Sequence, residues 1–337
     1  MRAVVIHEHG GIDRLTYTPD YRDPPFGEGD VLVRVRACTL NYHDVFTRRG
    51  MPGIKIPLPL IMGIDAAGDI AKVGPGVTGF KPGDRVLIDP INRVQRGFMG
   101  ETFDGGLAEL VRVPAHMCIP LPASIGYAEA AALPTAYGTA HRMILDRGKL
   151  KAGETILILG ASGGVGTCCV QLAKRAGAKV IVAASSQDKL DRLKALGADV
   201  GIDYATQDFV AECHRQFGRA RVAKKDEGGI DVVVNFTGGD TWTKALRTLR
   251  RDGRMLTCGA TAGYDPKEDI RYIWTFELNI VGSNGWSRED VTALLAMLGD
   301  GTLEPVLHPE RFPLERAADA MRVLEERKSF GKVVIEP

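Results

Sequence analysis

The residues with the clearest chemical potential lie in one glycine-rich turn. Thr155–Gly166 reads TILILGASGGVG, so an apolar run leads into closely spaced glycines, and Thr167–Arg175 has helical composition. Aligned on the pattern G-x-G-x-x-G, Ala161, Gly163 and Gly166 take the three glycine places. Such a strand–turn–helix unit lets the backbone approach a pyrophosphate, whose charge the helix N-terminus stabilises. The alternative is a glycine-rich loop that only joins two packed elements.

A second strand at Lys179–Ala184 follows the predicted helix at the distance that a βαβ unit needs. The order of strand, glycine turn, helix and strand therefore favours dinucleotide binding over the plain loop. We predict that the cofactor contacts the whole turn, which comprises Ala161, Ser162, Gly163, Gly164, Val165 and Gly166.

The end of this second strand bears on which dinucleotide binds. An NAD site normally has an acidic residue here to bind the ribose hydroxyls, but this chain has Ala184 and Ser185. Ser185 can donate a hydrogen bond to a 2′-phosphate, and Lys189 can neutralise its charge. An ordinary polar loop is the alternative, and Asp188 lies close enough to weaken the preference. We predict NADPH as the preferred cofactor, with NADH still possible.

The middle of the chain alternates between strand and helix patterns. Helices are expected between the strands, at 165–176, 189–196, 208–217 and 242–250, and the strand candidates are 156–159, 180–184, 200–202, 231–235 and 254–258. This alternation predicts a Rossmann-type α/β fold, a doubly wound parallel sheet with helices on both faces. Ligands bind at the carboxyl ends of such strands. The backbones of Asn235, Thr237, Cys258 and Gly259 are therefore expected near the cofactor.

The first 120 residues show a different pattern, with short strands separated by glycine and proline turns. Strands are expected at 2–7, 30–37, 66–73, 85–88 and 105–113. Such spacing predicts a compact β-barrel-like unit. A helical segment, 127–150, is interrupted at Pro134, and after a strand at 279–282 come helices at 290–298 and 314–328 and a last strand at 332–335.

Composition excludes several classes of function. The chain has 337 residues, 45% of them hydrophobic, and a formal net charge of +1. This length favours two domains, and a near-neutral chain without a basic stretch argues against nucleic acid or an anionic membrane as partner. The six cysteines are scattered, with no C-x-x-C pair, and no apolar run is long enough for a membrane span. We expect a cytoplasmic protein that acts on a small molecule.

Four further motifs complete the pattern that the glycine turn begins: C38TLNYHD44, G63IDAAG68, G79FKPGDRV86 and T135AYG138. With them the whole chain resembles the medium-chain dehydrogenase/reductase superfamily, which includes alcohol dehydrogenases and quinone oxidoreductases. The resemblance implies a GroES-like β-barrel catalytic domain made from both chain ends, residues 1–136 and 286–337, with a Rossmann dinucleotide-binding domain at 137–285 inserted between them. It also implies that Tyr204 packs near the 2′-phosphate, as a tyrosine does in quinone oxidoreductases.

This chain lacks the residues that bind zinc in the alcohol dehydrogenases that it resembles. Their places fall on Asn41, Ile64 and Ala131, while Cys38 lies three residues too early to serve. The stretch Asp89–Asp104, where zinc members carry four clustered cysteines, has none. We therefore expect no zinc and no other metal site, because Asp65 alone makes none.

Without zinc as a Lewis acid, simple alcohols are poor substrates. A quinone or a conjugated C=C, as in an enone or enoyl thioester, accepts hydride more easily because its own oxygen takes up the negative charge. The resemblance implies this class of reductase. The alternatives are an alcohol or aldehyde dehydrogenase that works without zinc, and a nucleotide-binding protein with little turnover.

The resemblance also suggests three catalytic candidates. Asn41 stands at the first zinc-ligand place, so its amide is expected to face the nicotinamide or the substrate. His43 occupies the place of a proton-relay Ser or Thr and is able to protonate the product enolate, unless it is merely packed at the wall. Tyr137 either lines the pocket or is a core residue. Arg93 and Arg96 either meet an anionic substrate or are solvated loop charges.

The family's habit and an apolar edge strand, N279IVG282, further predict a homodimer.

Overall fold

The computed structural model describes residues 1–224 and 227–337 of the chain. These residues form two compact units. Unit 1 comprises Met1–Ala136 and Val291–Pro337, and unit 2 comprises Tyr137–Asp290. The units divide the chain at 136/137 and 290/291, and the domain boundaries expected from the sequence are 136/137 and 285/286.

Unit 2 contains the predicted doubly wound sheet. Its six strands are parallel and lie in the order β11-β10-β9-β12-β13-β14. They are β9 (Thr155–Ile158), β10 (Lys179–Ala184), β11 (Val200–Asp203), β12 (Ile230–Val234), β13 (Leu249–Thr257) and β14 (Asn279–Gly282). The strand order reverses between β9 and β12, so the carboxyl ends of these two strands define the point where such sheets bind ligands.

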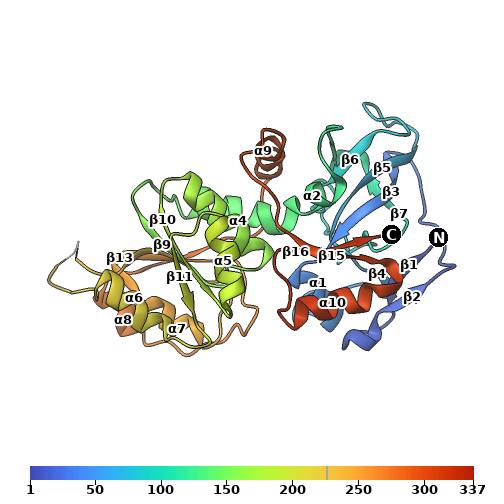
Figure 1. The fold of residues 1–337 in the computed structure, drawn as a ribbon. Coiled ribbons are helices and arrows are strands. Elements are labelled where there is room, and N and C mark those ends of the chain that lie inside the picture. Colours follow the sequence, from blue (N-terminus) through green and yellow to red (C-terminus); the bar gives the residue numbers. More distant parts are fainter. Residues whose placement is uncertain (225–226) are drawn as a thin grey trace. The chain divides into compact units, whose positions relative to one another are not determined.

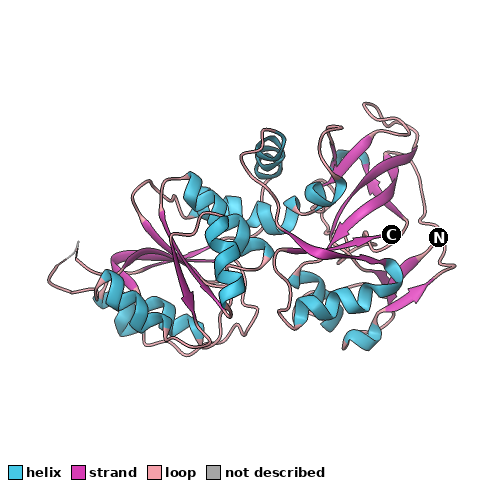
Figure 2. Ribbon diagram, viewed as in Figure 1, coloured by secondary structure: helices cyan, strands magenta, loops and turns pink. Residues whose placement is uncertain are grey.

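Helices cover the two faces of this sheet (Figures 1 and 2). They are α3 (Thr139–His141), α4 (Gly164–Arg175), α5 (Gln187–Ala195), α6 (Phe209–Phe217), α7 (Thr241–Leu246) and α8 (Ile270–Thr275). Because helices lie on both sides, the central strands are apolar on both faces, and side chains such as Leu157, Ile181 and Val233 form one core cluster.

Unit 1 is built mainly from antiparallel strands (Figure 2). Its larger sheet follows the order β15-β16-β3-β5-β6-β8, with β7 also paired to β3. These strands are β3 (Asp30–Thr39), β5 (Asp65–Val73), β6 (Arg85–Ile88), β7 (Leu110–Pro114), β8 (Cys118–Pro120), β15 (Leu307–Pro313) and β16 (Lys332–Glu336). A smaller sheet has the order β2-β1-β4, formed by Thr16–Thr18, Ala3–Ile6 and Leu60–Ile61.

The sheet of unit 1 joins distant parts of the chain. β3 pairs with β5 on one side, where Thr39 faces Asp65, and with the C-terminal β16 on the other, where Thr39 faces Val334. Helices α1 (Tyr42–Arg49), α2 (Tyr127–Ala131) and α10 (Ala317–Glu325) belong to this unit, and α9 (Arg288–Gly299) crosses the second boundary. The residues after β3 are thus held beside the first residue of β5 and the start of β16.

Two helices were not expected from the sequence. In α1 the carboxylate of Asp44 accepts a hydrogen bond of 2.7 Å from the backbone N–H of Asn41, so the helix begins with a polar residue and an acid three positions later. α8 begins after Asp269, whose side chain accepts from Arg271 N. Both are short, with eight and six residues, so a pattern search for long amphipathic helices misses them.

Two expected boundaries were also wrong. The helix predicted at 242–250 ends at Leu246, and β13 already begins at Leu249. The interruption predicted at Pro134 lies at Ala132, between the end of α2 at Ala131 and a π-helical stretch, Leu133–Gly138. Proline is tolerated at the second position of that stretch since an N–H in the first turn has no intrahelical partner.

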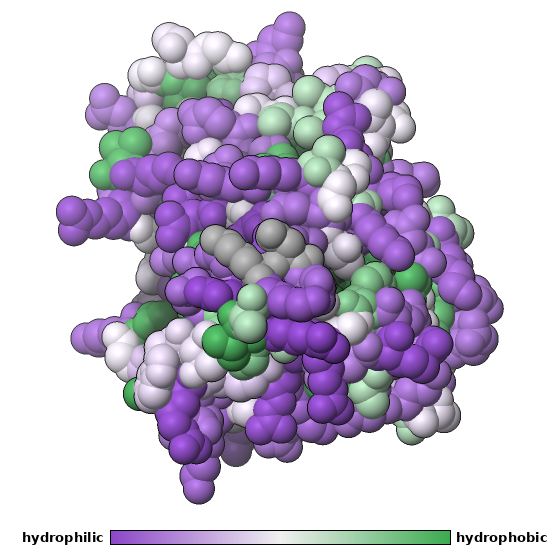
Figure 3. Space-filling view, turned by 90° about the vertical axis from the view of Figure 1, so that its left-hand side faces the viewer, coloured by the Kyte–Doolittle hydropathy of each residue, from purple (hydrophilic) through white to green (hydrophobic). Residues whose placement is uncertain are grey.

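The face shown in Figure 3 is mostly hydrophilic, with hydrophobic residues in small separate groups. Among residues 1–224 and 227–337, no helix combines the length and the apolar character needed to cross a membrane.

Candidate active site

The glycine turn leaves the N-terminus of α4 open. Gly160 follows β9 with φ of +70°, and a Cβ on Gly166 would lie 2.3 Å from the Gly160 carbonyl oxygen. Only glycine at position 166 therefore lets helix and strand approach so closely. A Cβ on Gly163 would meet only the Gly160 oxygen, at 3.6 Å. Space is therefore open beside Gly163 at the N-terminus of this 12-residue helix, and a helix N-terminus suits a pyrophosphate.

The end of β10 carries hydroxyl groups and no carboxylate. Ser185 is exposed, and Ser186 caps α5 by accepting a hydrogen bond from Lys189 N. The backbone N–H of Tyr204 donates to Ala184 O at 3.0 Å, which brings this exposed tyrosine beside the same strand end. Partial burial lowers the pKa of Lys189, opposed by the charge of Asp188. Ser185, Lys189 and Tyr204 thus all lie near the carboxyl end of β10.

Asn235 lies at the point where the strand order reverses. Its Oδ1 accepts hydrogen bonds from the N–H groups of Thr237 and Gly238, both at 3.0 Å, and this fixes the turn after β12. The side chain is fully buried, and its Nδ2 has no hydrogen-bond partner among the described residues. A buried donor without a partner is costly, so a ligand acceptor at this strand end would remove that cost.

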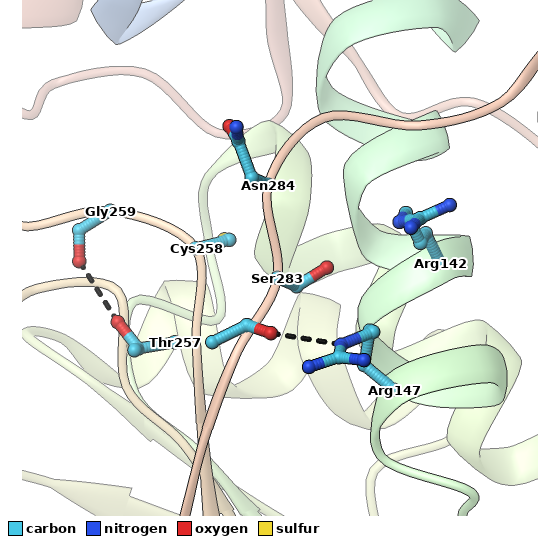
Figure 4. Close-up of a pocket in the computed structure, with 8 residues that line it drawn as sticks. Arg142, Arg147, Thr257, Cys258, Gly259, Ser283 and Asn284 are labelled. Atoms are coloured by element: carbon cyan, nitrogen blue, oxygen red, sulfur yellow. Dashed lines mark hydrogen bonds between the residues drawn. The ribbon is translucent and has the colours of Figure 1, made fainter.

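A pocket of about 390 Å³ opens where β13 and β14 end (Figure 4). It is lined by Arg142, Arg147, Thr257, Cys258, Gly259, Gly282, Ser283 and Asn284. Arg147 Nε donates to Gly282 O at 3.0 Å. Arg142 Nε and Ser283 Oγ are buried without a partner in the described chain, and the Ser283 hydroxyl points toward the helix that carries Arg142. These donors suit a small group rich in acceptor oxygens.

Tyr137 is a core residue of unit 2. Its side chain is fully buried, and its hydroxyl lies 3.2 Å from Thr167 Oγ1 on α4. This position favours the core role that the sequence left open, and the pocket role stays an untested prediction.

In unit 1, Asn41 belongs to a buried cluster that we call the lysine cluster, formed by Asn41, Asp65, Thr135 and Lys332. Asn41 Nδ2 donates to Asp65 Oδ2 at 2.8 Å, and Asn41 Oδ1 accepts from Lys332 Nζ at 2.5 Å. The ammonium also lies 3.3 Å from Asp65 Oδ2. Thr135 donates its N–H and its hydroxyl to Asp65 Oδ1, at 3.2 and 2.7 Å. Both polar atoms of the Asn41 amide are therefore engaged inside unit 1.

Burial makes this cluster demanding. The side chains of Lys332 and Asp65 are only 3% and 0% exposed, so each charge needs the other. Asp44 lies nearby and is fully buried, with one oxygen bonded to Asn41 N and the other without a partner among the described residues. Burial is the main cause that raises the pKa of Asp44 to about 6.

His43 occupies the first turn of α1 and is partly exposed. Its Nε2 lies 2.5 Å from Glu101 Oε2, where the imidazole is 32% exposed and the carboxylate 9%. The ring also meets Phe98 edge-on, with centroids 5.1 Å apart and an interplanar angle of 86°. The imidazole is thus held in one orientation while part of its surface stays accessible.

The loop arginines behave differently from each other. Arg93 pairs with the buried carboxylate of Asp89, four residues earlier. Arg96 has a positive φ of 60°, as in a tight turn. Contact of either with a substrate remains untested.

Comparison with known proteins adds independent information. Residues 27–123 match the family model for an alcohol dehydrogenase GroES-like domain, and residues 164–300 match the model for a zinc-binding dehydrogenase. Over its whole length the chain is 31% identical to a synaptic vesicle membrane protein VAT-1 homolog of Rattus norvegicus, and the match covers 84% of that relative. It is also 32% identical over its whole length to an NADPH-dependent alkenal/one oxidoreductase, chloroplastic, of Arabidopsis thaliana, and this match covers 80% of that relative.

The chain belongs to the medium-chain dehydrogenase/reductase superfamily. A crystal structure of an NAD-dependent alcohol dehydrogenase also matches over the full length of both chains, with 36% identity and a TM-score of 0.90. Unit 1 is therefore the GroES-like domain of this superfamily and unit 2 its Rossmann domain, and the chain is an oxidoreductase. The fold class predicted from the sequence is confirmed.

Sequence reasoning missed several of the residues described above in the two units. Lys332 carried a signal, because a lysine opens the buried strand K332VVI335. Thr135 was quoted only as part of a motif. Glu101, Arg142 and Ser283 gave none, since each acquires its role from a partner or pocket that the fold alone brings near.

Proposed function

We propose that this chain is a zinc-independent, NADPH-dependent oxidoreductase that transfers hydride to a quinone or an α,β-unsaturated carbonyl compound, such as an enone or an enoyl thioester. The observation that carries the proposal is the lysine cluster. It includes Asn41, at the first zinc-ligand place of the family, and Asp65, two residues after Gly63. The ammonium of Lys332 contacts both side chains.

These residues do not fit zinc. Zinc needs several thiolate, imidazole or carboxylate ligands, whereas Asn41 offers an amide oxygen that already accepts from Lys332. The other two ligand places hold Ile64 and Ala131, both fully buried. Among the described residues no group of three or more His, Cys, Asp or Glu side chains is arranged to hold a metal ion. The ammonium of Lys332 lies 2.5 Å from the amide oxygen of Asn41, so it occupies the space beside the first ligand place.

The residues of unit 2 fit a dinucleotide, and NADPH better than NADH. The open N-terminus of α4 would hold the pyrophosphate, and Asn235 Nδ2 offers a buried donor at the strand reversal. The end of β10 offers Ser185 and Lys189 to a 2′-phosphate and lacks the acid that would repel one. The similar alkenal/one oxidoreductase is NADPH-dependent by name, whereas the similar crystal structure is named NAD-dependent.

When bound, the cofactor supplies a hydride, and the acceptor then needs one proton. A conjugated acceptor spreads the resulting charge onto its own oxygen, so it requires no Lewis acid. The imidazole of His43, in the first turn of α1, is partly exposed, and we propose that it gives this proton. Asp44 is buried and keeps its bond to Asn41, so its role is to cap α1.

Spectrophotometry tests this function directly. NADPH oxidation would be followed at fixed enzyme concentration with a panel of quinones, enones, enoyl thioesters, aldehydes and, in reverse with NADP, alcohols. Metal content would be measured on protein purified without a histidine tag. We expect turnover of conjugated acceptors and no stoichiometric zinc.

Other outcomes point to other functions. Preference for aldehydes and alcohols would favour an alcohol dehydrogenase that works without zinc. Tight NADPH binding with no turnover would favour a nucleotide-binding protein. One zinc per chain, lost together with activity on chelation, would refute the zinc-independent mechanism.

We also propose a homodimer that pairs two copies of β14, the edge strand of the sheet in unit 2. Ile280 on this strand is 40% exposed and Trp274 on α8 is 62% exposed, which is costly for an edge left open. Light scattering should give twice the chain mass, and Ile280→Asp should lower it. A wild-type monomer at all concentrations would refute the dimer.

The scattered free cysteines support a cytoplasmic location as part of this proposal.

A further inference from the structure

A buried carboxylate contacts the imidazole of His43 from a loop far away in the sequence. Glu101 Oε2 lies 2.5 Å from His43 Nε2, although 58 residues separate them. Glu101 is 7% exposed as a residue, so its carboxylate is largely removed from water. A charge in such surroundings is retained only with a good partner. His43 is the side-chain partner that the structure gives it.

The surrounding turn holds both groups in place. Glu101 N donates to Phe98 O at 3.1 Å, and Gly100 N donates to Phe103 O at 2.8 Å, so the backbone on both sides of the carboxylate is fixed. Phe98, from the same turn, packs edge-on against the imidazole. One loop therefore supplies a hydrogen-bond acceptor and an apolar wall to the same ring.

We propose that Glu101 is the positioning residue of His43, holding the proton of neutral imidazole on Nε2 so that Nδ1 is the nitrogen that exchanges protons with substrate. This rests on the proposed function, in which His43 protonates the reduced acceptor. The assignment follows from the geometry, because a carboxylate only accepts at this contact and the Nε2 position must carry a hydrogen to satisfy it.

The step balances as follows. Hydride adds to the β-carbon of the acceptor and forms a C–H bond, and the π electron pair moves to give an enolate. The imidazolium of His43 transfers the Nδ1 proton to the α-carbon, forming the second C–H bond. Neutral His43 keeps its hydrogen on Nε2, bonded to Glu101, and Nδ1 regains a proton from solvent. The acceptor is reduced and NADPH is oxidised.

The simpler reading is that the pair only fastens the loop to α1. The two readings differ in what Glu101 does to the ring. A fastening contact would leave the catalytic rate unaffected once the protein is folded, whereas a positioning contact sets the tautomer. In the Ser-His-Asp proteases, loss of the orienting carboxylate leaves the histidine in the wrong tautomer and lowers kcat strongly.

The first measurement needs no substrate. ¹⁵N-histidine spectra of the full-length protein, assigned with His43→Ala, report which ring nitrogen carries the hydrogen above neutral pH. We expect one Nε2–H tautomer in the wild type and a tautomer mixture in Glu101→Ala. Glu101→Gln should restore the single tautomer, because its amide oxygen accepts the same bond. A tautomer mixture or an Nδ1–H form in the wild type would overturn the proposal.

The second measurement uses the best acceptor of the panel. Glu101→Ala should lower kcat tenfold or more with little change in KM, as part of the ~10²–10⁴-fold contribution of a general acid. Glu101→Gln should recover much of the loss. Glu109→Ala is the matched control, since the Glu109 carboxylate of unit 1 pairs with Arg2, at 2.8 Å, rather than with His43.

The outcomes separate the two proposals. A changed tautomer in Glu101→Ala with no kinetic effect of His43→Ala would reject the proton role of His43 while the positioning role stands. Equal losses in Glu101→Ala and Glu101→Gln, with unchanged tautomers, would reject the positioning role. Where His43→Ala lowers kcat, a folded Glu101→Ala that keeps wild-type kcat would reject it as well.

Discussion

The glycine turn of unit 2 and the lysine cluster of unit 1 draw their residues from the chain in opposite ways. The turn takes its residues from one continuous segment, Ala161–Gly166, between β9 and α4. The cluster joins Asn41, Asp65 and Thr135 to Lys332, which lies 291 residues after Asn41. The first site is partly buried backbone between a strand and a helix, while the second is a buried group of polar and charged side chains that bond one another.

This difference predicts where substitutions have large effects. A buried ion pair gives little net stability, but removing one partner leaves an uncompensated charge. A surface cation beside a cofactor contributes less, since water screens it. Variants in unit 1 should therefore alter folding and turnover strongly, and variants at the cofactor edge should alter affinity modestly.

Lys332→Met should have the largest effect. It leaves the Asp65 carboxylate buried without its cation, which we expect to lower the free energy of unfolding by about 3–5 kcal/mol. The double variant Lys332→Met/Asp65→Asn should recover much of this loss. Urea unfolding measures both.

Lys328→Met is the control, because Lys328 pairs with Glu326 on the surface, where its side chain is 70% exposed. Equal losses in the two single lysine variants would contradict the buried role of Lys332.

His43→Ala should lower kcat by more than tenfold, within the ~10²–10⁴-fold range of general acid catalysis, and leave NADPH affinity nearly unchanged. Steady-state kinetics and fluorescence titration with NADPH check this. The matched variant is His116→Ala, whose imidazole hydrogen-bonds Asn92 within unit 1. Wild-type turnover in His43→Ala would mean that solvent supplies the proton.

Asp44 should give stability a pH dependence. Burial raises its folded-state pKa to about 6, above the ~3.9 of an unfolded chain. The folded state therefore keeps a proton that the unfolded state has released, so this stabilisation is present at low pH and lost as pH rises through about 6. The wild type should lose roughly 2 kcal/mol relative to Asp44→Asn between pH 4 and 7.

Urea unfolding of the wild type and Asp44→Asn across this pH range measures the difference. Two stability curves that stay parallel would show that folding does not raise the pKa of Asp44.

Lys189→Ala should have the smallest effect. We expect NADPH to bind roughly tenfold more weakly, about 1.4 kcal/mol, and NADH to bind as before. Dissociation constants for both cofactors test this, with Lys194→Ala on the exposed side of α5 as control. An equal loss for both cofactors, or for neither, would remove Lys189 from the phosphate site.

Local patterns of apolar and polar residues predicted most of the strands and helices of unit 2. β11 and β14 begin at the predicted residues, Val200 and Asn279, and β9 and β10 begin within about one residue of the predicted ones, because apolar runs bounded by glycine and polar turns report burial directly. Boundaries failed where a second influence acted, as at Leu249, where pairing of β13 with β12 converts the end of a helical pattern into strand.

The sequence by itself determined the glycine turn, the missing acid at Ser185 and the absence of family zinc ligands at Asn41, Ile64 and Ala131. All of these depend on residues close together in the chain or on single positions in a motif. Only the tertiary structure brought Lys332 to Asn41 and Glu101 to His43. β16 must pair with β3 to place the ammonium, and the loop around Phe98 must fold over α1 to place the carboxylate. Contacts of this kind depend on strand pairing and loop closure across tens to hundreds of residues, and no local pattern of polarity encodes them.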